Sequence, residues 1–215
     1  MLENHSVQTS LTLLSRIEAQ DDDDAWRLFA RLYGPIVYSW CREAGLHPDD
    51  ADDVGQEVFR VVAQKISTFE PGRKASGAFR SWLWGITRLQ LLYYLRSMKR
   101  QPTGQGGTDH QLSLQRLQQE SQEPESIHGV TSRQLLLRSA IEILRPKFDP
   151  QTWQAFWDMA VKGRPAKDIG EELEMTPRAV RQAKFRVTKK LRELLHEEIS
   201  DLFGSETPPT EQADS

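Results

Sequence analysis

Residues 166–195 read AKDIGEELEMTPRAVRQAKFRVTKKLRELL, and this stretch decides the fold that we expect for the second half of the chain. Its first eight residues form a short amphipathic pattern through Ile169 and Leu173, which predicts a helix. Thr176 followed by Pro177 is typical of a helix start, with threonine as the N-cap and proline in the first turn. Apolar residues then recur at helical spacing. The stretch therefore predicts two helices joined by a tight turn.

The second of these helices is strongly basic, with seven Lys or Arg and no acidic residue over 176–192. A helix-turn-helix places its second helix in the major groove of DNA, with the N-terminal residues over the base edges. Arginine can pair there with guanine and glutamine with adenine, whereas later cations suit phosphates. We expect base contacts from Arg178, Arg181, Gln182 and Lys184, and phosphate contacts from Arg186, Lys189, Lys190 and Arg192. The alternative is a solvated cationic face.

A second basic segment combines cations with aromatic residues. Residues 73–100 include seven basic residues and no acidic one, and residues 79–96 read FRSWLWGITRLQLLYYLR, with the apolar spacing of one long amphipathic helix. Such a surface suits unpaired DNA, whose bases stack on aromatic rings beside a cationic groove. The candidates are Arg80, Trp82, Trp84, Arg88, Tyr93, Tyr94, Arg96, Lys99 and Arg100. The same spacing also fits Trp82 and Tyr93 as residues of the hydrophobic core.

An acidic segment precedes this helix. Residues 18–57 contain eleven acidic and three basic residues, and residues 48–62 read PDDADDVGQEVFRVV, a helical pattern that starts with proline and two aspartates. It does not fit a calcium-binding loop, because valines stand where oxygen ligands are required. Asp53, Gln56 and Glu57 lie close together on the predicted helix and can meet an arginine-rich partner protein. A solvated acidic face is the alternative.

The remaining sequence indicates two all-α domains. An earlier helix over 24–40 is predicted to be interrupted at Gly34-Pro35. Residues 101–130 are rich in Gln, Gly, Ser and Pro, which predicts a flexible linker. We therefore expect a helical domain over 1–100, the linker over 101–130, a helix-turn-helix domain over 131–203 and a disordered tail over 204–215.

Composition excludes several functional classes. The chain has 215 residues, a formal net charge of −3 and one cysteine, Cys41, which cannot form an internal disulfide and which we expect to be buried. No segment is apolar enough for a signal peptide or a membrane span, so we expect a cytoplasmic protein without membrane insertion. The histidines show no metal-ligand spacing, and no nucleophile motif or phosphate-binding loop occurs. We expect no catalytic residue, no metal and no cofactor.

Taken in order, these segments resemble the extracytoplasmic-function sigma factors of the sigma-70 family of bacterial RNA polymerase. Residues 48–62 resemble the family's acidic helix, residues 79–96 its promoter-melting helix and residues 164–194 its terminal helix-turn-helix. The resemblance implies a non-enzymatic, all-α protein with a region 2-like bundle and a region 4-like helix-turn-helix domain. Its implied partners are promoter DNA and core RNA polymerase, through the β′ clamp helices and the β subunit, with an anti-sigma factor as a further candidate.

The resemblance also assigns roles to the three charged segments. It implies that Asp53, Gln56 and Glu57 dock on the β′ clamp helices. It implies that the minus-ten promoter element is contacted and melted by Arg80, Trp82, Trp84, Arg88, Leu89, Tyr93, Arg96, Lys99 and Arg100. The minus-thirty-five element is then read as duplex by Arg178, Arg181, Gln182, Lys184, Arg186 and Lys189.

The chain departs from the family pattern at three positions. Leu89 and Tyr93 stand where the family commonly has Asn and Asp, so they either pack inward or make apolar and stacking contacts with DNA. Gly55 replaces a larger apolar residue in the acidic helix, at a cost of about 1 kcal/mol in helix propensity. Two other functions remain alternatives: a stand-alone helix-turn-helix regulator that does not need polymerase, and a degenerate sigma-like interaction protein that sequesters a regulator.

Overall fold

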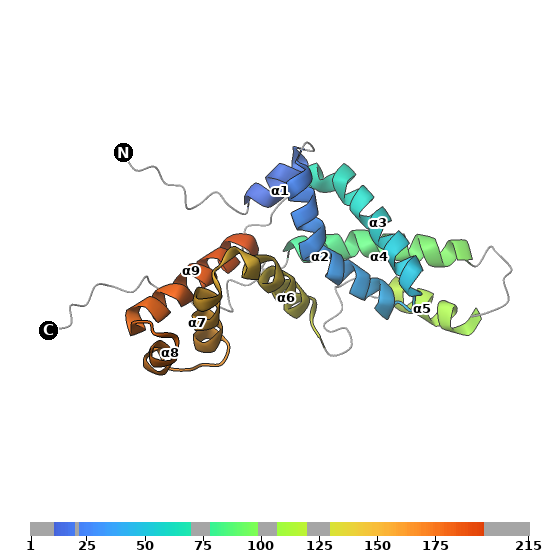
Figure 1. Cartoon of the computed structure of the whole chain (residues 1–215). Coiled ribbons are helices and arrows are strands. Elements are labelled where there is room, and N and C mark those ends of the chain that lie inside the picture. Colours follow the sequence, from blue (N-terminus) through green and yellow to red (C-terminus); the bar gives the residue numbers. More distant parts are fainter. Residues whose placement is uncertain (1–10, 20–21, 70–77, 99–106, 120–129, 196–215) are drawn as a thin grey trace. The chain divides into compact units, whose positions relative to one another are not determined.

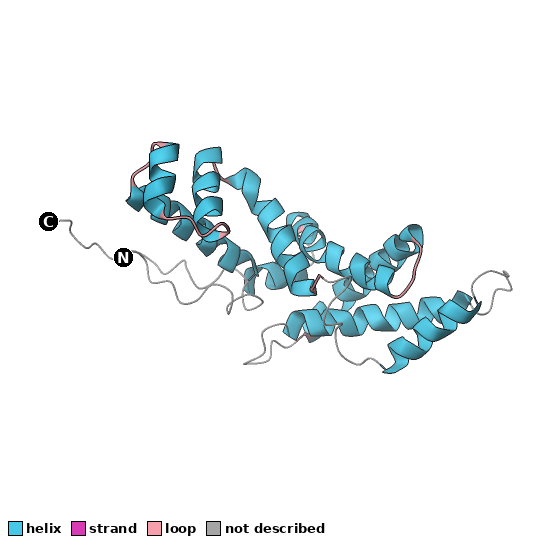
Figure 2. Cartoon of the chain, turned by 90° about the horizontal axis from the view of Figure 1, so that it is seen from below, coloured by secondary structure: helices cyan, strands magenta, loops and turns pink. Residues whose placement is uncertain are grey.

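The structure is a computed structural model, and it describes residues 11–19, 22–69, 78–98, 107–119 and 130–195 (Figure 1). Within these ranges every regular element is a helix and no strand forms, as Figure 2 shows. The all-α prediction is therefore confirmed. The chain divides into two compact units, Met1–Ser139 and Ala140–Ser215.

The helices follow one another along the chain in the order of their labels in Figure 1. The first unit contains α1 (Leu11–Glu18), α2 (Asp23–Glu43), α3 (Pro48–Lys65), the short 3-10 helix η1 (Ile66–Thr68), α4 (Ala78–Met98) and α5 (Gly107–Gln119). The division between the units falls within α6 (Ser132–Leu144). The second unit continues with η2 (Arg145–Lys147), α7 (Pro150–Ala160), α8 (Ala166–Leu173) and α9 (Pro177–Leu195).

The hydrophobic core of the first unit lies where α2, α3 and α4 contact one another. The apolar stripes of the three helices meet there, as the helical spacing predicts, and they include Phe29, Ile36 and Trp40 of α2, Val58 and Val62 of α3, and Leu83, Leu91 and Leu95 of α4. Cys41 is fully buried in this core, as expected for a small apolar residue. Burial raises the pKa of its thiol to about 12, so the thiol stays protonated at neutral pH.

Helix α2 continues through Pro35, and the predicted interruption at Gly34-Pro35 is wrong. A proline inside a helix removes one backbone hydrogen bond and crowds the residue before it. Gly34 reduces this crowding because it has no Cβ. Ile36 and Val37, which follow the proline, are fully buried. The burial of both sides of the proline in one core keeps α2 continuous.

Part of the predicted linker is helical, because α5 lies within 101–130 and packs on α4. Leu117 of α5 is only 4% exposed, and the Arg88 guanidinium of α4 donates hydrogen bonds to the carbonyl oxygens of Leu117 and Gln118, at 2.5 and 3.0 Å. These carbonyls belong to the last turn, where no intrahelical donor is available. The remainder of the predicted linker and the predicted tail lie outside the described residues.

The second unit packs α7 and α8 against α9. Its core consists of small and branched apolar residues, with longer ones around them: Ala155, Ala166, Ile169, Val180 and Ala183, surrounded by Met159, Leu173 and Met175. Asp149 caps the start of α7, and its carboxylate accepts a hydrogen bond from the Thr152 N–H at 2.7 Å. This core holds α8 and α9 as a pair.

Candidate nucleic-acid and protein interfaces

The turn between α8 and α9 sets the direction in which α9 leaves the second unit. Glu174 adopts a left-handed backbone conformation with φ of 54°, and the Met175 N–H donates a hydrogen bond to the Gly170 carbonyl at 2.9 Å. Thr176 then starts α9, since its Oγ1 accepts a hydrogen bond from the Ala179 N–H at 3.1 Å. The predicted helix, tight turn and capped second helix are confirmed.

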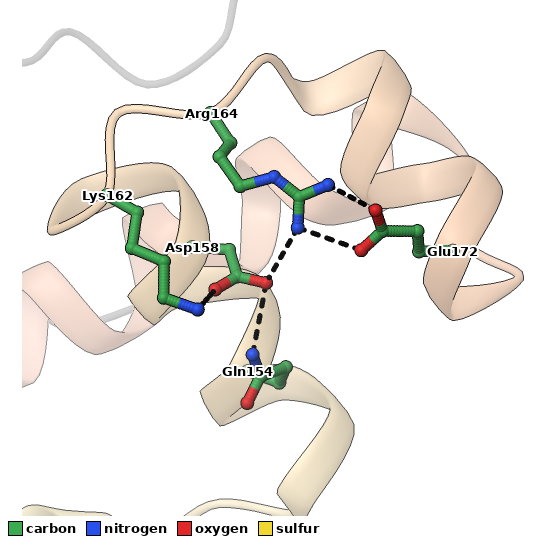
Figure 3. A network of polar contacts seen from close by, with 5 residues as sticks. All are labelled: Gln154, Asp158, Lys162, Arg164 and Glu172. Carbon is green, nitrogen blue, oxygen red and sulfur yellow. Dashed lines mark hydrogen bonds and ion pairs between the residues drawn. The ribbon is translucent and has the colours of Figure 1, made fainter.

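A buried carboxylate, Asp158, connects α7 to the loop that leads into α8 (Figure 3). Its side chain forms an ion pair with Lys162 at 2.6 Å and another with Arg164 at 3.3 Å, and it accepts a hydrogen bond from Gln154 at 3.0 Å. Arg164 also donates to Glu172 of α8, at 2.8 Å. The hydrogen bond from Lys162 in particular holds the pKa of Asp158 below its usual range. Our sequence analysis missed this network, although the spacing of Asp158 and Lys162 by four residues was a signal for it.

The exposed side of α9 carries the residues that were predicted to contact duplex DNA. Val180, Ala183, Val187 and Leu191 face the core of the unit. The opposite side exposes Arg178, Arg181, Gln182, Arg186 and Lys189, with Lys184 half-buried. Arg186 also donates a hydrogen bond to the Thr152 hydroxyl of α7 at 3.2 Å. The first turns of α9 therefore present two arginines and one glutamine to solvent, as a recognition helix requires.

Helix α4 exposes an apolar pair in a segment without acidic residues. Leu89 is 46% exposed and Tyr93 63% exposed, and they lie one turn apart on the same side of the helix. Arg96 is exposed one further turn along, whereas Arg80 and Trp82 are half-buried. Leu89 and Tyr93 therefore point outward and do not pack into the core. Lys99 and Arg100 lie outside the described residues.

Two residues predicted to contact melted DNA are engaged within the first unit instead. Trp84 is 2% exposed, and its ring packs edge-on against Trp40 with the centroids 5.3 Å apart. The prediction of Trp84 as a surface residue is wrong, because α4 is covered on more than one side and the residue lies in a second buried stripe. The guanidinium of Arg88 is held by the carbonyls at the end of α5. The outward surface of α4 therefore contains fewer of the predicted DNA-contacting residues than expected.

Helix α3 presents its carboxylates on the side away from its valines. Val54 and Val58 are buried, whereas Asp53 and Gln56 are exposed and Glu57 is half-buried. Glu57 accepts a hydrogen bond from Arg60 Nε at 2.8 Å, and this pair holds the pKa of Glu57 below its usual range. The three predicted docking residues therefore lie together on one accessible side of α3.

A tyrosine connects this helix to α4. Burial and a hydrogen bond to Asp50, in the first turn of α3, raise the pKa of Tyr94. Tyr94 and the start of α3 therefore lie close together. Tyr94 was predicted as an aromatic surface candidate, and it is half-buried.

The structure offers no sign of a metal centre in the part of the chain that it describes. There, no three His, Cys, Asp or Glu side chains come together in a way that could hold a metal ion. Among the same residues, no helix has the length and apolarity needed to span a membrane. The candidate interfaces are the outward sides of α3, α4 and α9.

A comparison with known protein families identifies one domain of the chain. Residues 29–101 match the family model for sigma-70 region 2, a span that contains most of α2 and all of α3 and α4. The first unit therefore contains a sigma-70 region 2 domain. Proteins with this domain are non-catalytic transcription initiation factors that bind core RNA polymerase. This match over residues 29–101 supports a sigma factor of the sigma-70 family. No curated protein matches the chain.

Proposed function

We propose that this sigma factor is of the extracytoplasmic-function type and that it uses two DNA-binding domains, over 1–100 and 131–203, joined by a connecting segment. The first docks on core polymerase and contacts the minus-ten element, and the second reads the minus-thirty-five element. RNA polymerase performs the chemistry in the cytoplasm, and the sigma factor supplies promoter selection and strand opening. An anti-sigma factor remains a candidate regulator.

One observation carries this proposal. A region 2 domain is followed in the same chain by a helix-turn-helix whose second helix exposes Arg178, Arg181 and Gln182. A stand-alone regulator would use the helix-turn-helix but would have no role for the region 2 domain. A sigma factor that contacts DNA with both parts explains both features, because two weak contacts on one DNA molecule reinforce each other.

The three outward surfaces divide the proposed work between them. Asp53, Gln56 and Glu57 of α3 offer carboxylates and an amide to the β′ clamp helices, with the β subunit as a second contact. Leu89, Tyr93 and Arg96 of α4 offer apolar, aromatic and cationic contacts to the unpaired minus-ten strand. Trp84 has no place in this surface, because it is buried.

The minus-thirty-five contacts follow from the position of each side chain along α9. Arg178, Arg181, Gln182 and Lys184 lie in its first turns and are proposed to contact base edges. Arg186 and Lys189 lie further along and are proposed to contact phosphates. Phosphate contacts position the helix without reading sequence, so this arrangement separates specificity from affinity.

The test is a footprint with and without core polymerase. Promoters are first selected from a random-sequence library by run-off transcription with core polymerase and the full chain. On a selected promoter we expect protection at two separated elements with core polymerase, and weak protection with the chain alone. Strong site-specific protection by the chain alone would instead establish a stand-alone regulator. A chain that binds neither core polymerase nor DNA would be a degenerate interaction protein.

A further inference from the structure

A hollow of about 370 Å³ opens between α2 and α3, beside the proposed docking residues. Its walls are mainly apolar and come from both helices: Gly34, Val37 and Tyr38 of α2, and Ala51, Gly55 and Phe59 of α3. Two glycines thus lie in one small depression, which we call the Gly34/Gly55 hollow. Tyr38 at its edge is 37% exposed, so the hollow is reached directly from solvent.

Neither glycine is required by the packing of the first unit. A Cβ added to Gly34 would meet nothing within 4 Å, and a Cβ added to Gly55 would have the Val37 side chain as its nearest neighbour at 4.0 Å. Both residues lie inside helices, where glycine is less favourable than alanine. The missing side chain of Gly55 therefore weakens α3 and leaves the hollow open, whereas Gly34 also relieves the crowding before Pro35.

The mouth of the hollow is polar and acidic. Asp52 and Gln56 contribute to its lining, and both are exposed. Asp53 and Glu57 follow them directly on α3, and none of the residues that line the hollow is basic. A partner that covers the hollow therefore needs an apolar side chain for its interior and cations for its edge.

We propose that the Gly34/Gly55 hollow receives one apolar side chain from the arginine-rich segment of core polymerase that docks on Asp53, Gln56 and Glu57. This inference rests on the proposed function and adds to it a specific anchor. Gln56 belongs both to the lining of the hollow and to the docking surface, so one partner segment can occupy both. A buried apolar anchor surrounded by polar contacts is the usual arrangement at the centre of a tight protein interface.

Filling the hollow separates this proposal from a purely electrostatic dock. In Gly55→Leu the new side chain occupies the hollow from within, while the carboxylates stay in place. Equilibrium binding of the labelled full chain to core polymerase is measured together with thermal unfolding. We expect Gly55→Leu to weaken binding roughly tenfold or more, as expected for loss of one buried apolar side chain, without a lower melting temperature. Gly55→Ala should raise the melting temperature and leave most of the binding intact.

Gly85→Leu is the matched control for a leucine in place of a helical glycine. Gly85 is exposed on α4, does not line the hollow and has nothing within 4 Å of an added Cβ, so its substitution should not change binding to core polymerase. If Gly55→Leu lowers the melting temperature, a measurement on the unsubstituted chain decides instead. Hydroxyl-radical oxidation of Tyr38 in the unsubstituted chain should also fall when core polymerase binds.

The outcomes distinguish this proposal from the proposed function. If the unsubstituted chain does not bind core polymerase at all, the proposed function is wrong. A second outcome is that the chain binds and that Asp53→Lys with Glu57→Lys weakens binding, while a folded leucine variant binds as tightly as the unsubstituted chain. This result would support docking on the carboxylates and would show that the proposed apolar anchor is wrong. Unchanged oxidation of Tyr38 in the bound chain would also overturn the anchor.

Discussion

A Cβ on Gly170 would lie 2.5 Å from the carbonyl oxygen of Met175. This oxygen belongs to the backbone of the turn between α8 and α9, so it cannot move aside as the end of a flexible side chain can. Gly170 is therefore the residue that lets the turn fold back closely on α8. The orientation of α9, and with it the proposed reading of the minus-thirty-five element, depends on this contact.

Gly170→Ala should consequently destabilise the second unit by about 1–3 kcal/mol, the range found for overpacked sites. Urea unfolding of the full chain measures this change, and hydrogen exchange in α8 and α9 localises it to the turn. Gly85→Ala is the control, because Gly85 has open space around it and alanine is favoured in a helix by up to about 1 kcal/mol. Equal stability of Gly170→Ala and the unsubstituted chain would show that the turn adapts easily.

The exposed pair on α4 predicts how the minus-ten strand is held. Tyr93→Ala should weaken complexes with core polymerase on a premelted minus-ten promoter by about 1–3 kcal/mol, since one aromatic platform for a base is lost. Tyr93→Phe retains the ring and should retain the affinity. Leu89→Asn should change which bases are preferred, because an amide can form hydrogen bonds that leucine cannot. Anisotropy titrations with promoters of different sequence measure these effects. Unchanged affinity in Tyr93→Ala would show that the Tyr93 ring does not stack on a base of the minus-ten strand.

Two cations on α9 should respond differently to removal. Arg181→Ala, in the first turns, should cost about 1–3 kcal/mol on the preferred minus-thirty-five sequence and relax discrimination at one base pair. Lys189→Ala should weaken binding to all sequences alike and reduce the salt dependence by about one unit of slope. Binding of the full chain with core polymerase to a library of minus-thirty-five sequences, at several salt concentrations, tests both. A uniform loss in Arg181→Ala would contradict base reading by this residue.

Asp158 predicts a pH-dependent contribution to the stability of the second unit. Its pKa is lowered in the folded chain, so its ion pairs stabilise the fold at pH values above the ordinary aspartate pKa of about 3.9. That contribution is lost as the pH falls below this value and through the lowered pKa. Asp158→Asn should therefore cost about 1–3 kcal/mol at pH 7, with a smaller difference from the unsubstituted chain near pH 3.

Denaturant unfolding at pH 7, 5 and 3 measures this difference. Glu171→Gln is a suitable control because it neutralises an exposed carboxylate on the neighbouring helix α8. A cost of Asp158→Asn that is the same at all three pH values would show that packing, and not charge, gives Asp158 its role.

The sequence was sufficient to predict the all-α class, the helix-turn-helix and the long helix α4. Helical spacing of apolar residues and the Thr176-Pro177 start are local signals, and the structure confirms them. The outward position of the docking residues on α3 also followed from the periodicity, since Val54 and Val58 define the buried side of the same helix. Local periodicity therefore identified most of the candidate surfaces.

What the sequence did not reveal depends on contacts between distant residues. The continuity of α2 through Pro35 depends on burial on both sides of the proline, which local propensity does not include. Helix α5 depends on Arg88, about thirty positions away from the carbonyls that it binds. Trp84 was predicted as a surface residue, and its contact with Trp40, a residue of another helix, places it in the core. The Gly34/Gly55 hollow likewise forms only where α2 and α3 pack together, so neither helix predicts it alone.

The measurement that tests the central claim most directly is run-off transcription with core polymerase, the full chain and a promoter library, with the transcripts identified by sequencing. The account predicts transcripts from a common promoter sequence, and a loss of at least about tenfold when Asp53→Lys and Glu57→Lys reverse the docking charges. Asp23→Lys with Asp24→Lys makes the same change in charge at two exposed positions of α2 and should retain most of the activity. Transcription that is absent with the unsubstituted chain, or unaffected by the reversal at Asp53 and Glu57, would contradict the account.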